Sequence, residues 1–272
     1  MKLFAIADLH LSRPDNRQAL LDLPAHSEDW LIVVGDVCEN TTLFKKAMAL
    51  LAQKFTKLFW TPGNHDLWTM PTENEAPRGL FRYNELVAIC RQYGIHTPED
   101  EYVRWPLCPE PIFIAPIFTF YDYSFRPQEV SLEKAISWAA ETNVICNDEY
   151  LLHSDPLASR AEWCRVRCRY TETRLTEAAQ HGSLILASHF PLRYDLVNIP
   201  RIPRFSLWCG TKRTEDWHTR FPVTAVVYGH LHMRGTHLRD GIPHTEVSFG
   251  YPQQWSQKRG MNGYLHEVFQ HV

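Results

Sequence analysis

The stretch Thr61-Pro62-Gly63-Asn64-His65-Asp66 directly follows an apolar run at residues 57–60. A short apolar run that ends in polar residues is typical of a buried β-strand followed by a loop. This loop would combine a turn-forming glycine with a neutral oxygen ligand, an imidazole and a carboxylate. Taken alone, the stretch could be an ordinary polar loop, so its meaning depends on how the other predicted strands end.

The other predicted strands end in the same way. Buried strands are predicted at residues 3–7, 30–34, 58–61, 111–120, 183–187 and 224–228. All but the strand at 111–120 are followed by residues that can bind a metal ion, namely Asp8 and His10, Asp36, Asn64 and His65, His189, and His230 and His232. Because open α/β sheets place their sites at the carboxyl ends of the strands, we expect these side chains to converge.

Predicted helices alternate with the first strands. Helical spacing predicts helices at residues 16–21, 42–55, 81–93, 132–142 and 158–181. The alternation implies crossover connections and a largely buried sheet, so the predicted fold class is α/β. Residues 192–210 lack a clear period and are predicted to form a long, ordered loop. The chain after residue 233 is predicted to form a hairpin that turns at Asp240 and Gly241.

Length and composition favour a single domain. The chain has 272 residues, of which 44% are hydrophobic, and this is ample for one large core. We therefore predict one domain over residues 1–272, with an insertion or lid at about 121–174 and a C-terminal hairpin at about 234–249. The net charge of -3 and the pI near 6.5 provide no overall basic field that would attract nucleic acid.

The sequence shows no sign of export or of a membrane span. The N-terminal apolar run stops at Asp8 and is too short for a signal peptide, and no stretch approaches the ~20 apolar residues of a membrane span. The seven cysteines are irregularly spaced and include no CxxC pair, which fits a reducing compartment. Cys164 and Cys168 lie one helical turn apart, which we interpret as packing. We expect a cytoplasmic protein with no membrane partner.

The residue types in these blocks select a class of metal. Alternate residues of an extended chain point the same way, so Asp8 and His10 could reach one ion, and so could His230 and His232. Oxygen and imidazole ligands suit manganese, iron or zinc better than calcium, and the lack of cysteine ligands argues against a structural zinc cluster. Each block alone would more often be a turn, but five blocks in equivalent positions are hard to explain as turns.

The five blocks together resemble those of a known family. Asp8-x-His10, Gly35-Asp36, Gly63-Asn64-His65-Asp66, Ser188-His189 and Gly229-His230-x-His232 resemble, in order, the signature blocks of calcineurin-like binuclear metallophosphoesterases. The blocks span residues 8 to 232, and Ser188 stands where the family usually has glycine. The resemblance implies a four-layer α/β/β/α sandwich with the metals at the carboxyl ends of the strands.

The resemblance also implies a role for each residue. One metal would be held by Asp8, His10 and His232, the other by Asn64, His189 and His230, and Asp36 would bridge the two. His65 would contact the phosphate and assist the leaving group, while Asp66 would hydrogen-bond the His65 ring and orient it. No expected ligand type is missing, so an active enzyme is expected.

The reaction implied by the resemblance is hydrolysis of a phosphoester bond by a metal-bridging hydroxide. Two metal ions roughly 3.5–4 Å apart would bind the phosphate and lower the pKa of the bridging water. Two transition-metal ions are expected, with manganese first and iron or zinc as alternatives. The hydroxide would attack in line with the leaving oxygen, so no covalent phosphoenzyme is required.

Several features narrow the substrate. The second block lacks the Asp-Arg-Gly continuation of Ser/Thr protein phosphatases, and the third block ends in Asp66 instead of glutamate. We therefore predict a small phosphomonoester or a nucleotide phosphodiester as the substrate, with contacts from Asn64, Arg193 and Trp208. No obligate protein partner is evident from the sequence.

Two alternative functions stay open. Residues 193–213 contain five lysines and arginines and a single acid, Asp195. This basic loop could bind a nucleic-acid backbone, which would make the protein a manganese-dependent nuclease, or it could simply be solvated. A non-catalytic, metal-bound scaffold is the alternative from another class of protein. The complete ligand set and His65 argue against a scaffold.

Overall fold

Two β-sheets packed face to face form the centre of the computed structural model, which describes residues 1–71 and 76–269. The first sheet has the strand order β10-β1-β2-β3, and the second has the order β4-β5-β6-β7-β9-β8. The strands are β1 (Leu3–Ile6), β2 (His26–Val34), β3 (Phe55–Thr61), β4 (Val103–Arg104), β5 (Ile112–Pro116), β6 (Ser183–Ala187), β7 (Val223–Tyr228), β8 (Gly235–Arg239), β9 (Ile242–Glu246) and β10 (His266–Glu267).

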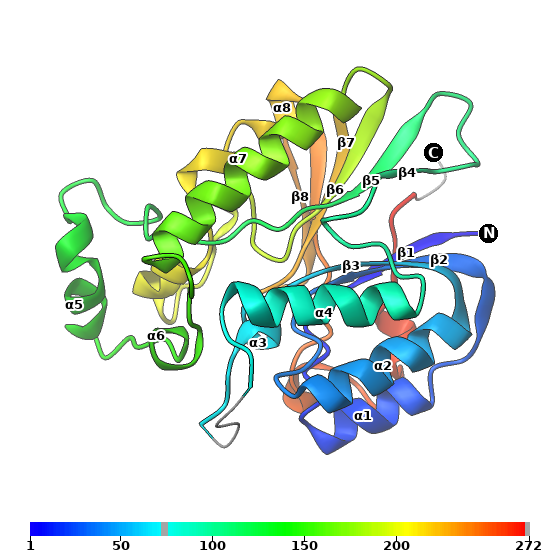
Figure 1. Ribbon diagram of the computed structural model, residues 1–272, viewed down its shortest axis with the longest axis horizontal. Coiled ribbons are helices and arrows are strands. Elements are labelled where there is room, and N and C mark those ends of the chain that lie inside the picture. The colour runs from blue at the N-terminus through cyan, green and yellow to red at the C-terminus, as the bar shows by residue number, and fades with distance from the viewer. Residues whose placement is uncertain (72–75, 270–272) are drawn as a thin grey trace.

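Helices cover the outer faces of both sheets. Figure 1 shows α1, α2 and α4 against the first sheet and α7 and α8 over the second, which gives the predicted α/β/β/α layers. The helices are α1 (Pro14–Leu21), α2 (Thr41–Lys54), α3 (Asn64–Leu67), α4 (Leu80–Gln92), α5 (Ala135–Ala140), α6 (Asp148–Leu151), α7 (Arg160–Ala178) and α8 (Trp217–Arg220). Within the described ranges, no helix is both long and apolar enough to cross a membrane.

The alternation of side chains along the strands builds the core between the sheets. Leu3, Ala5 and Ala7 point into one cluster, together with Ile32 of β2 and Ile185 of β6. The intervening strand residues belong to a second cluster, which the helices cover. The central strands of each sheet are thus buried on both faces, as expected for strands joined by crossover helices. Burial of each leucine or isoleucine side chain in these clusters contributes about 1.5–3 kcal/mol.

The parallel pairings bring the carboxyl ends of the central strands together. β1, β2 and β3 are parallel to one another, and so are β5, β6, β7 and β9. The two sheets meet where β1 ends, because Ala7 donates to the carbonyl of Val247 at 3.0 Å and accepts from Phe249 at 2.7 Å. The loops that leave both sheets therefore converge at this edge.

Some predicted elements differ from those in the structure. The strand predicted at 111–120 ends at Pro116, and the helix predicted at 132–142 is a 3-10 turn, Leu132–Lys134, followed by α5. The loop predicted at 192–210 contains two more 3-10 helices, Tyr194–Leu196 and Pro203–Trp208. The second begins with proline, whose fixed φ suits the first position of a helix. β8 and β9 pair antiparallel across the turn at residues 240–241.

Candidate metal centre

Three of the predicted ligands form a tight group at the ends of β1 and β7. His232 Nε2 lies 3.1 Å from both Asp8 Oδ1 and His10 Nε2. His10 Nε2 lies 3.8 Å from Asp8 Oδ1. All three side chains are buried or nearly so. Ligand atoms at these separations can share one metal ion, and the group has the predicted membership.

A second group forms around the end of β6. His189 Nε2 lies 3.3 Å from Asn64 Oδ1 and 3.5 Å from Asp36 Oδ1. The ring of His230 lies 5.2 Å from that of His189, measured between centroids. The other oxygen of Asp36, Oδ2, faces His10 Nε2 at 4.0 Å. Asp36 therefore lies between the two groups, as a bridging carboxylate must.

The backbone at the ligands is strained. Asp8, His10, Asp36, His230 and His232 all have positive φ, between 42° and 70°. Non-glycine residues rarely adopt this conformation, and when they do they concentrate at functional sites. We predicted that strand alternation would aim each Asp-x-His or His-x-His pair at one ion. That reasoning was wrong, because left-handed turns after the strands aim these side chains.

Glycines in the blocks give the ligands room. A Cβ on Gly63 would lie 2.0 Å from Asp36 Oδ1, and one on Gly229 would lie 2.4 Å from Asp8 Oδ2. We predicted that Gly63 permits a sharp turn, but its φ is -96°, which any residue adopts. Its function is therefore close approach, since any side chain at this position would displace the bridging carboxylate.

The electrostatics of the cluster suit a cation. Burial lowers the pKa of His10, His189 and His230, so their rings are neutral and carry a free lone pair. Nε2 of His230 is buried without a hydrogen-bond partner in the described part of the chain. Burial and the charge of Asp8 raise the pKa of Asp36. A metal ion would supply what each of these groups lacks, so the residues present fit a metal centre.

His65 lies beside this cluster with its ring held from two sides. Its Nε2 is 4.0 Å from Asp36 Oδ2, while its Nδ1 is 2.8 Å from Glu39 Oε1. Trp68 stacks on the ring with centroids 3.7 Å apart. Burial opposes ionisation of Glu39, but the hydrogen bond and the charge of His65, together with the hydrogen bond from Ser12 and a backbone hydrogen bond, outweigh burial and lower the pKa of Glu39 to about 2. Glu39 is therefore ionised at neutral pH.

The predicted role of Asp66 needs correction. Asp66 was expected to orient the His65 ring, but that position is taken by Glu39. The carboxylate of Asp66 instead accepts backbone N–H groups of Gly63, Asp36, Val37 and Cys38 at 2.8–3.1 Å. Asp66 therefore ties the second block to the third, and its contribution to the site is structural.

The C-terminal segment also reaches the cluster, although no sequence signal pointed to it. The Tyr251 ring stacks on His10 at 4.4 Å, and Gln254 Oε1 lies 2.7 Å from His232 Nδ1. A carbonyl at Nδ1 fixes the tautomer that leaves Nε2 free for a metal. The main chain of Val34 does the same for His189 at 2.8 Å.

Two predicted substrate contacts lie elsewhere. Trp208 is 1% exposed and donates through Nε1 to Glu149, so it is a packing anchor with no open face. Arg193 is held by Asp195 at 2.9 Å and by Asp240 at 3.6 Å. Neither residue lines the pocket beside the ligands. Both predictions are therefore corrected.

The pocket at the cluster has both polar and apolar lining residues. It has a volume of about 270 Å³. Its polar lining residues are Asp36, Asn64, His65, His230 and His232, together with Tyr251 and Gln254. Its other lining residues are Ile199, Ile202, Phe205 and Leu231. The site can therefore hold an anionic group that is attached to an apolar one.

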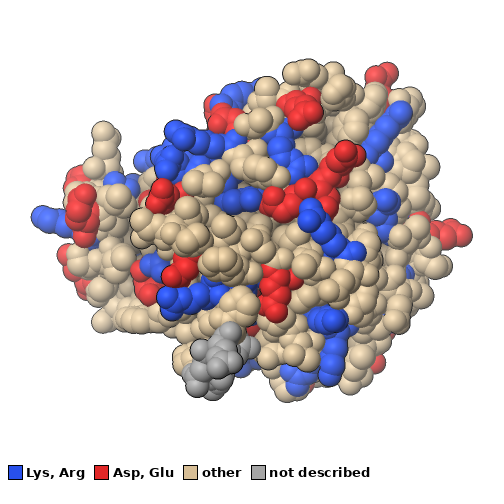
Figure 2. Space-filling model, in the orientation of Figure 1, with Lys and Arg blue, Asp and Glu red and all other residues tan. Residues whose placement is uncertain are grey.

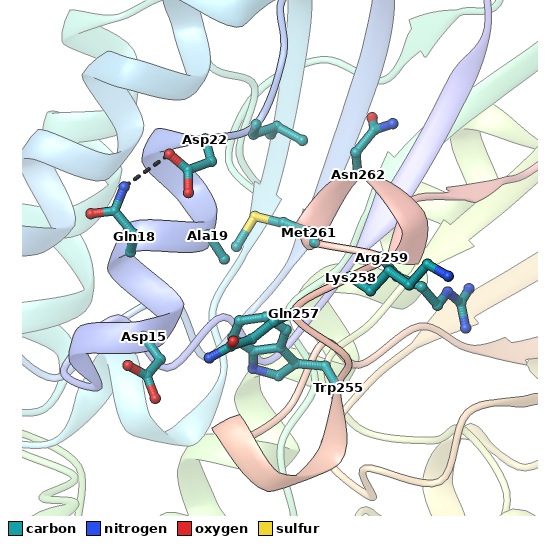
Figure 3. Close-up of a pocket in the computed structure, with 12 residues that line it drawn as sticks. Asp15, Gln18, Ala19, Asp22, Trp255, Gln257, Lys258, Arg259, Met261 and Asn262 are labelled. Atoms are coloured by element: carbon teal, nitrogen blue, oxygen red, sulfur yellow. Dashed lines mark hydrogen bonds between the residues drawn. The ribbon is translucent and has the colours of Figure 1, made fainter.

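A separate cavity lies between α1 and the C-terminal segment. It has a volume of about 430 Å³. Figure 3 shows Asp15 and Asp22 on the α1 side and Lys258 on the opposite side, with Met261 between them. None of the seven predicted metal ligands lines this cavity, so it is not part of the candidate metal centre.

Surface charge is mixed on the face seen in Figure 2. Basic side chains gather over α7, but acidic side chains lie among them. There, Arg220 pairs with Glu172 and lies 3.4 Å from Asp216. In the predicted basic loop, Arg204 pairs with Glu141 at 2.8 Å. Internal pairing of this kind leaves less positive charge for a nucleic-acid backbone.

Comparison with known proteins defines the class of this protein. The model of the calcineurin-like phosphoesterase family matches residues 1–234. The chain belongs to this family, whose members bind two metal ions, and it is a metal-dependent phosphoester hydrolase.

One relative is similar over nearly the whole chain. The acyl-carrier-protein phosphodiesterase PptH of Mycobacterium tuberculosis is 40% identical over 259 residues, which cover 94% of this chain and 80% of PptH. The crystal structure of that protein, described as phosphopantetheinyl hydrolase, matches with a TM-score of 0.92 over 98% of this chain and 95% of that one. A putative 5′-nucleotidase from Staphylococcus aureus is far more distant, with 11% identity and a TM-score of 0.43 over 90% of this chain and 48% of that chain.

Proposed function

We propose that this protein hydrolyses the phosphodiester that joins phosphopantetheine to a serine of an acyl carrier protein. The similarity to PptH supports this substrate. The observation that carries the proposal is the pocket at the metal-ligand cluster, because four apolar residues, here called the apolar wall, line it together with the candidate ligands: Ile199, Ile202, Phe205 and Leu231. The substrate would then be bound to a protein, which goes beyond the small phosphoester expected from the sequence.

The apolar wall suits the chemistry of the pantetheine arm. Next to its phosphate, the arm carries a carbon with two methyl groups. A phosphate at the ligand cluster would bring these methyl groups towards Ile199, Ile202 and Phe205, which line the same pocket. Burial of the two methyl groups would contribute on the order of 1–2 kcal/mol. The side chain of Ile202 is 46% exposed, so this wall reaches the protein surface, where a carrier protein could approach.

We propose the ligand assignment that the two groups suggest. Asp8, His10 and His232 would hold one metal, Asn64, His189 and His230 would hold the other, and Asp36 would contribute to both. When bound, the two ions supply positive charge for the phosphate oxygens and lower the pKa of a water molecule that attacks phosphorus. The amide of Asn64 is neutral, so it adds no repulsion to an approaching anionic phosphate.

His65 provides the proton for the leaving group in this proposal. Water adds its oxygen to phosphorus and releases a proton to solvent, while the bond from phosphorus to the serine oxygen breaks. The proton on His65 Nε2 moves to that serine oxygen, giving the unmodified carrier protein and free phosphopantetheine. Glu39 accepts a hydrogen bond from Nδ1 and stabilises the protonated ring before the transfer.

The metal, the compartment and the domain organisation complete the proposal. We take manganese as the native metal, with iron or zinc as alternatives, because the ligands are oxygen and imidazole. We place the protein in the cytoplasm, since all seven cysteines are free thiols. Residues 1–272 form one domain, with an insertion at about 121–174 beside the site.

The test compares several substrates with metal present. Purified enzyme with manganese should release phosphopantetheine from a holo-carrier protein and should hydrolyse a bis-aryl phosphate much faster than a mono-aryl phosphate. Single-stranded and double-stranded oligonucleotides should stay intact over a salt series. Cleavage of oligonucleotides without release of phosphopantetheine would support the nuclease alternative and contradict the proposal.

A further inference from the structure

A buried carboxylate from outside the signature blocks touches the candidate metal centre. Asp148 is the first residue of α6, in the part of the chain that projects from the sheets together with α5 (Figure 1). Its side chain is fully buried. Oδ1 accepts from Asn64 Nδ2 at 2.9 Å and from Trp68 Nε1 at 2.6 Å, while Oδ2 accepts from the hydroxyl of Tyr121 at 2.9 Å. Two of the three donors, Asn64 and Trp68, thus lie in α3 or directly after it, in the segment that also contains His65.

The first contact determines which atom of Asn64 faces the metals. An asparagine side chain can present either its oxygen or its nitrogen, and only the oxygen binds a metal ion. A carboxylate only accepts hydrogen bonds, so Asp148 binds the Nδ2 end of the amide. The Oδ1 end is then directed to His189 Nε2, 3.3 Å away. Without Asp148, the amide would be free to rotate and present a donor to the metal.

The second contact reaches the ring that acts on the substrate. Trp68 stacks on His65, and its indole nitrogen donates to the same Oδ1 atom that binds Asn64. The plane of Trp68 is therefore fixed by Asp148, and His65 lies between Trp68 and Glu39. One carboxylate oxygen thus connects a ligand of the second metal with the stack that holds the proton donor.

Asp148 is itself held in place by its neighbours. Arg160 donates to the carbonyl oxygens of Asp148 at 3.1 Å and Leu152 at 2.9 Å, which fixes both ends of α6. The adjacent Glu149 pairs with Arg160 and accepts from Tyr123 at 2.8 Å. Glu149 anchors this part of the chain through Arg160, Tyr123 and Trp208, and these partners differ from those of Asp148, so Glu149 offers a matched control.

We propose that Asp148 is a positioning residue that orients the Asn64 amide towards the second metal and fixes the Trp68–His65 stack. The segment around α5 and α6 thereby contributes to metal binding without supplying a ligand. This inference concerns the metal centre itself, so it holds for whichever phosphoester is the natural substrate. Loss of a group that orients a metal ligand typically weakens metal binding about 10–100-fold.

The test measures metal binding instead of turnover. Metal-free Asp148→Ala would be titrated with manganese, and bound metal would be measured by equilibrium dialysis and elemental analysis. We expect one ion to bind as in the unchanged protein and the other about 10–100-fold more weakly. Glu149→Gln and Tyr121→Phe should bind both ions normally, since both retain the Asp148–Asn64 bond. Normal binding by Asp148→Ala, or equal weakening in the controls, would overturn the proposal.

An exchange of the two side chains gives a second test that does not need the alanine variant to fold. Asn64→Asp alone places two carboxylates against each other and should bind the second ion weakly. Adding Asp148→Asn places an amide donor at residue 148 opposite a carboxylate acceptor at residue 64. The hydrogen bond between the two residues is restored with its direction reversed. The double variant should therefore bind the second ion at least about tenfold more tightly than Asn64→Asp. If the double variant binds it no better, Asp148 does not act through residue 64.

Discussion

Nδ1 of His65 lies 2.8 Å from Oε1 of Glu39, and the two residues come from different segments of the chain. Glu39 lies between β2 and α2, and His65 lies in α3, which follows β3. Because one ring nitrogen is occupied by a carboxylate, the other is left to face the candidate metals and the substrate. This pairing explains how a histidine among metal ligands can serve the leaving group.

Replacement of His65 should separate chemistry from metal binding. We expect His65→Ala to retain two metal ions, since the proposed ligands remain, but to lose about 10²–10⁴-fold in kcat. The loss should be greatest for aryl phosphodiesters with poor leaving groups, which depend most on protonation. A series of substrates of graded leaving-group pKa checks this. Equal loss across the series would mean that His65 mainly positions the phosphate.

Replacement of Glu39 should act through His65. In Glu39→Gln the charge that stabilises a protonated His65 ring is lost, so we expect kcat to fall about tenfold, or ~1.4 kcal/mol, with little change in metal content. Ser12→Ala is the control, because Ser12 binds Glu39 without touching His65. Kinetics with a bis-aryl phosphate provide the measurement. If Ser12→Ala lowers kcat as much as Glu39→Gln, the proposed link through His65 is contradicted.

Gly63 should be required for tight metal binding. In Gly63→Ala the new Cβ would meet Asp36 Oδ1 at 2.0 Å, so the bridging carboxylate must move, and we expect at least about tenfold weaker metal binding. Gly94→Ala is the control for backbone strain without a steric clash, since Gly94 has a φ of +69° but open space around it. Elemental analysis after dialysis distinguishes the two variants. Normal metal content in Gly63→Ala would show that the site tolerates the displacement.

The free energy of unfolding should decrease as pH falls, partly because of His244, which is not one of the candidate metal ligands. Burial, and then the charges of His218, Arg193 and Arg239, outweigh the attraction of Asp195 and lower the pKa of His244 to about 4. In the unfolded chain this pKa is about 6.5, so between pH 6.5 and pH 4 the unfolded state binds the extra proton. The free energy of unfolding should therefore decrease as pH falls through this window, by about 2 kcal/mol at pH 5.

The variant His244→Phe isolates this contribution. It removes the titrating group while keeping an aromatic ring in β9. Urea unfolding at pH 7.5 and pH 5, with a chelator present in both, should show a smaller loss for the variant than for the unchanged protein. An equal loss in both proteins would assign the acid sensitivity to other groups.

The sequence predicted the positions of the candidate ligands at strand ends, because short apolar runs that end in histidine or aspartate mark where buried strands stop. Asp8, Asp36, His189 and His230 all lie where such runs end, and the parallel pairing brings them together. The backbone geometry at these residues was not predictable in the same way. Positive φ at aspartate and histidine goes against local preference, and it persists because the surrounding fold holds it.

Residues that hold the ligands from a distance were missed for a different reason. Asp148 lies 84 positions from Asn64, and Gln254 lies 22 positions from His232. The residues around Asp148 form no pattern that distinguishes it from an acidic residue on the surface. Asp148 is buried only by tertiary packing. Trp208 shows the opposite error, since an apparently exposed loop tryptophan is a buried anchor.

If the proposed reaction is right, water cleaves the bond between phosphorus and the serine oxygen of a phosphopantetheine-bearing carrier protein. Mass spectrometry of both products, after reaction with manganese in water labelled with heavy oxygen, tests this. We expect one labelled oxygen in the phosphate of the released phosphopantetheine and an unlabelled serine on the carrier protein. A carrier protein that keeps its prosthetic group, or label that appears on the serine, would contradict it.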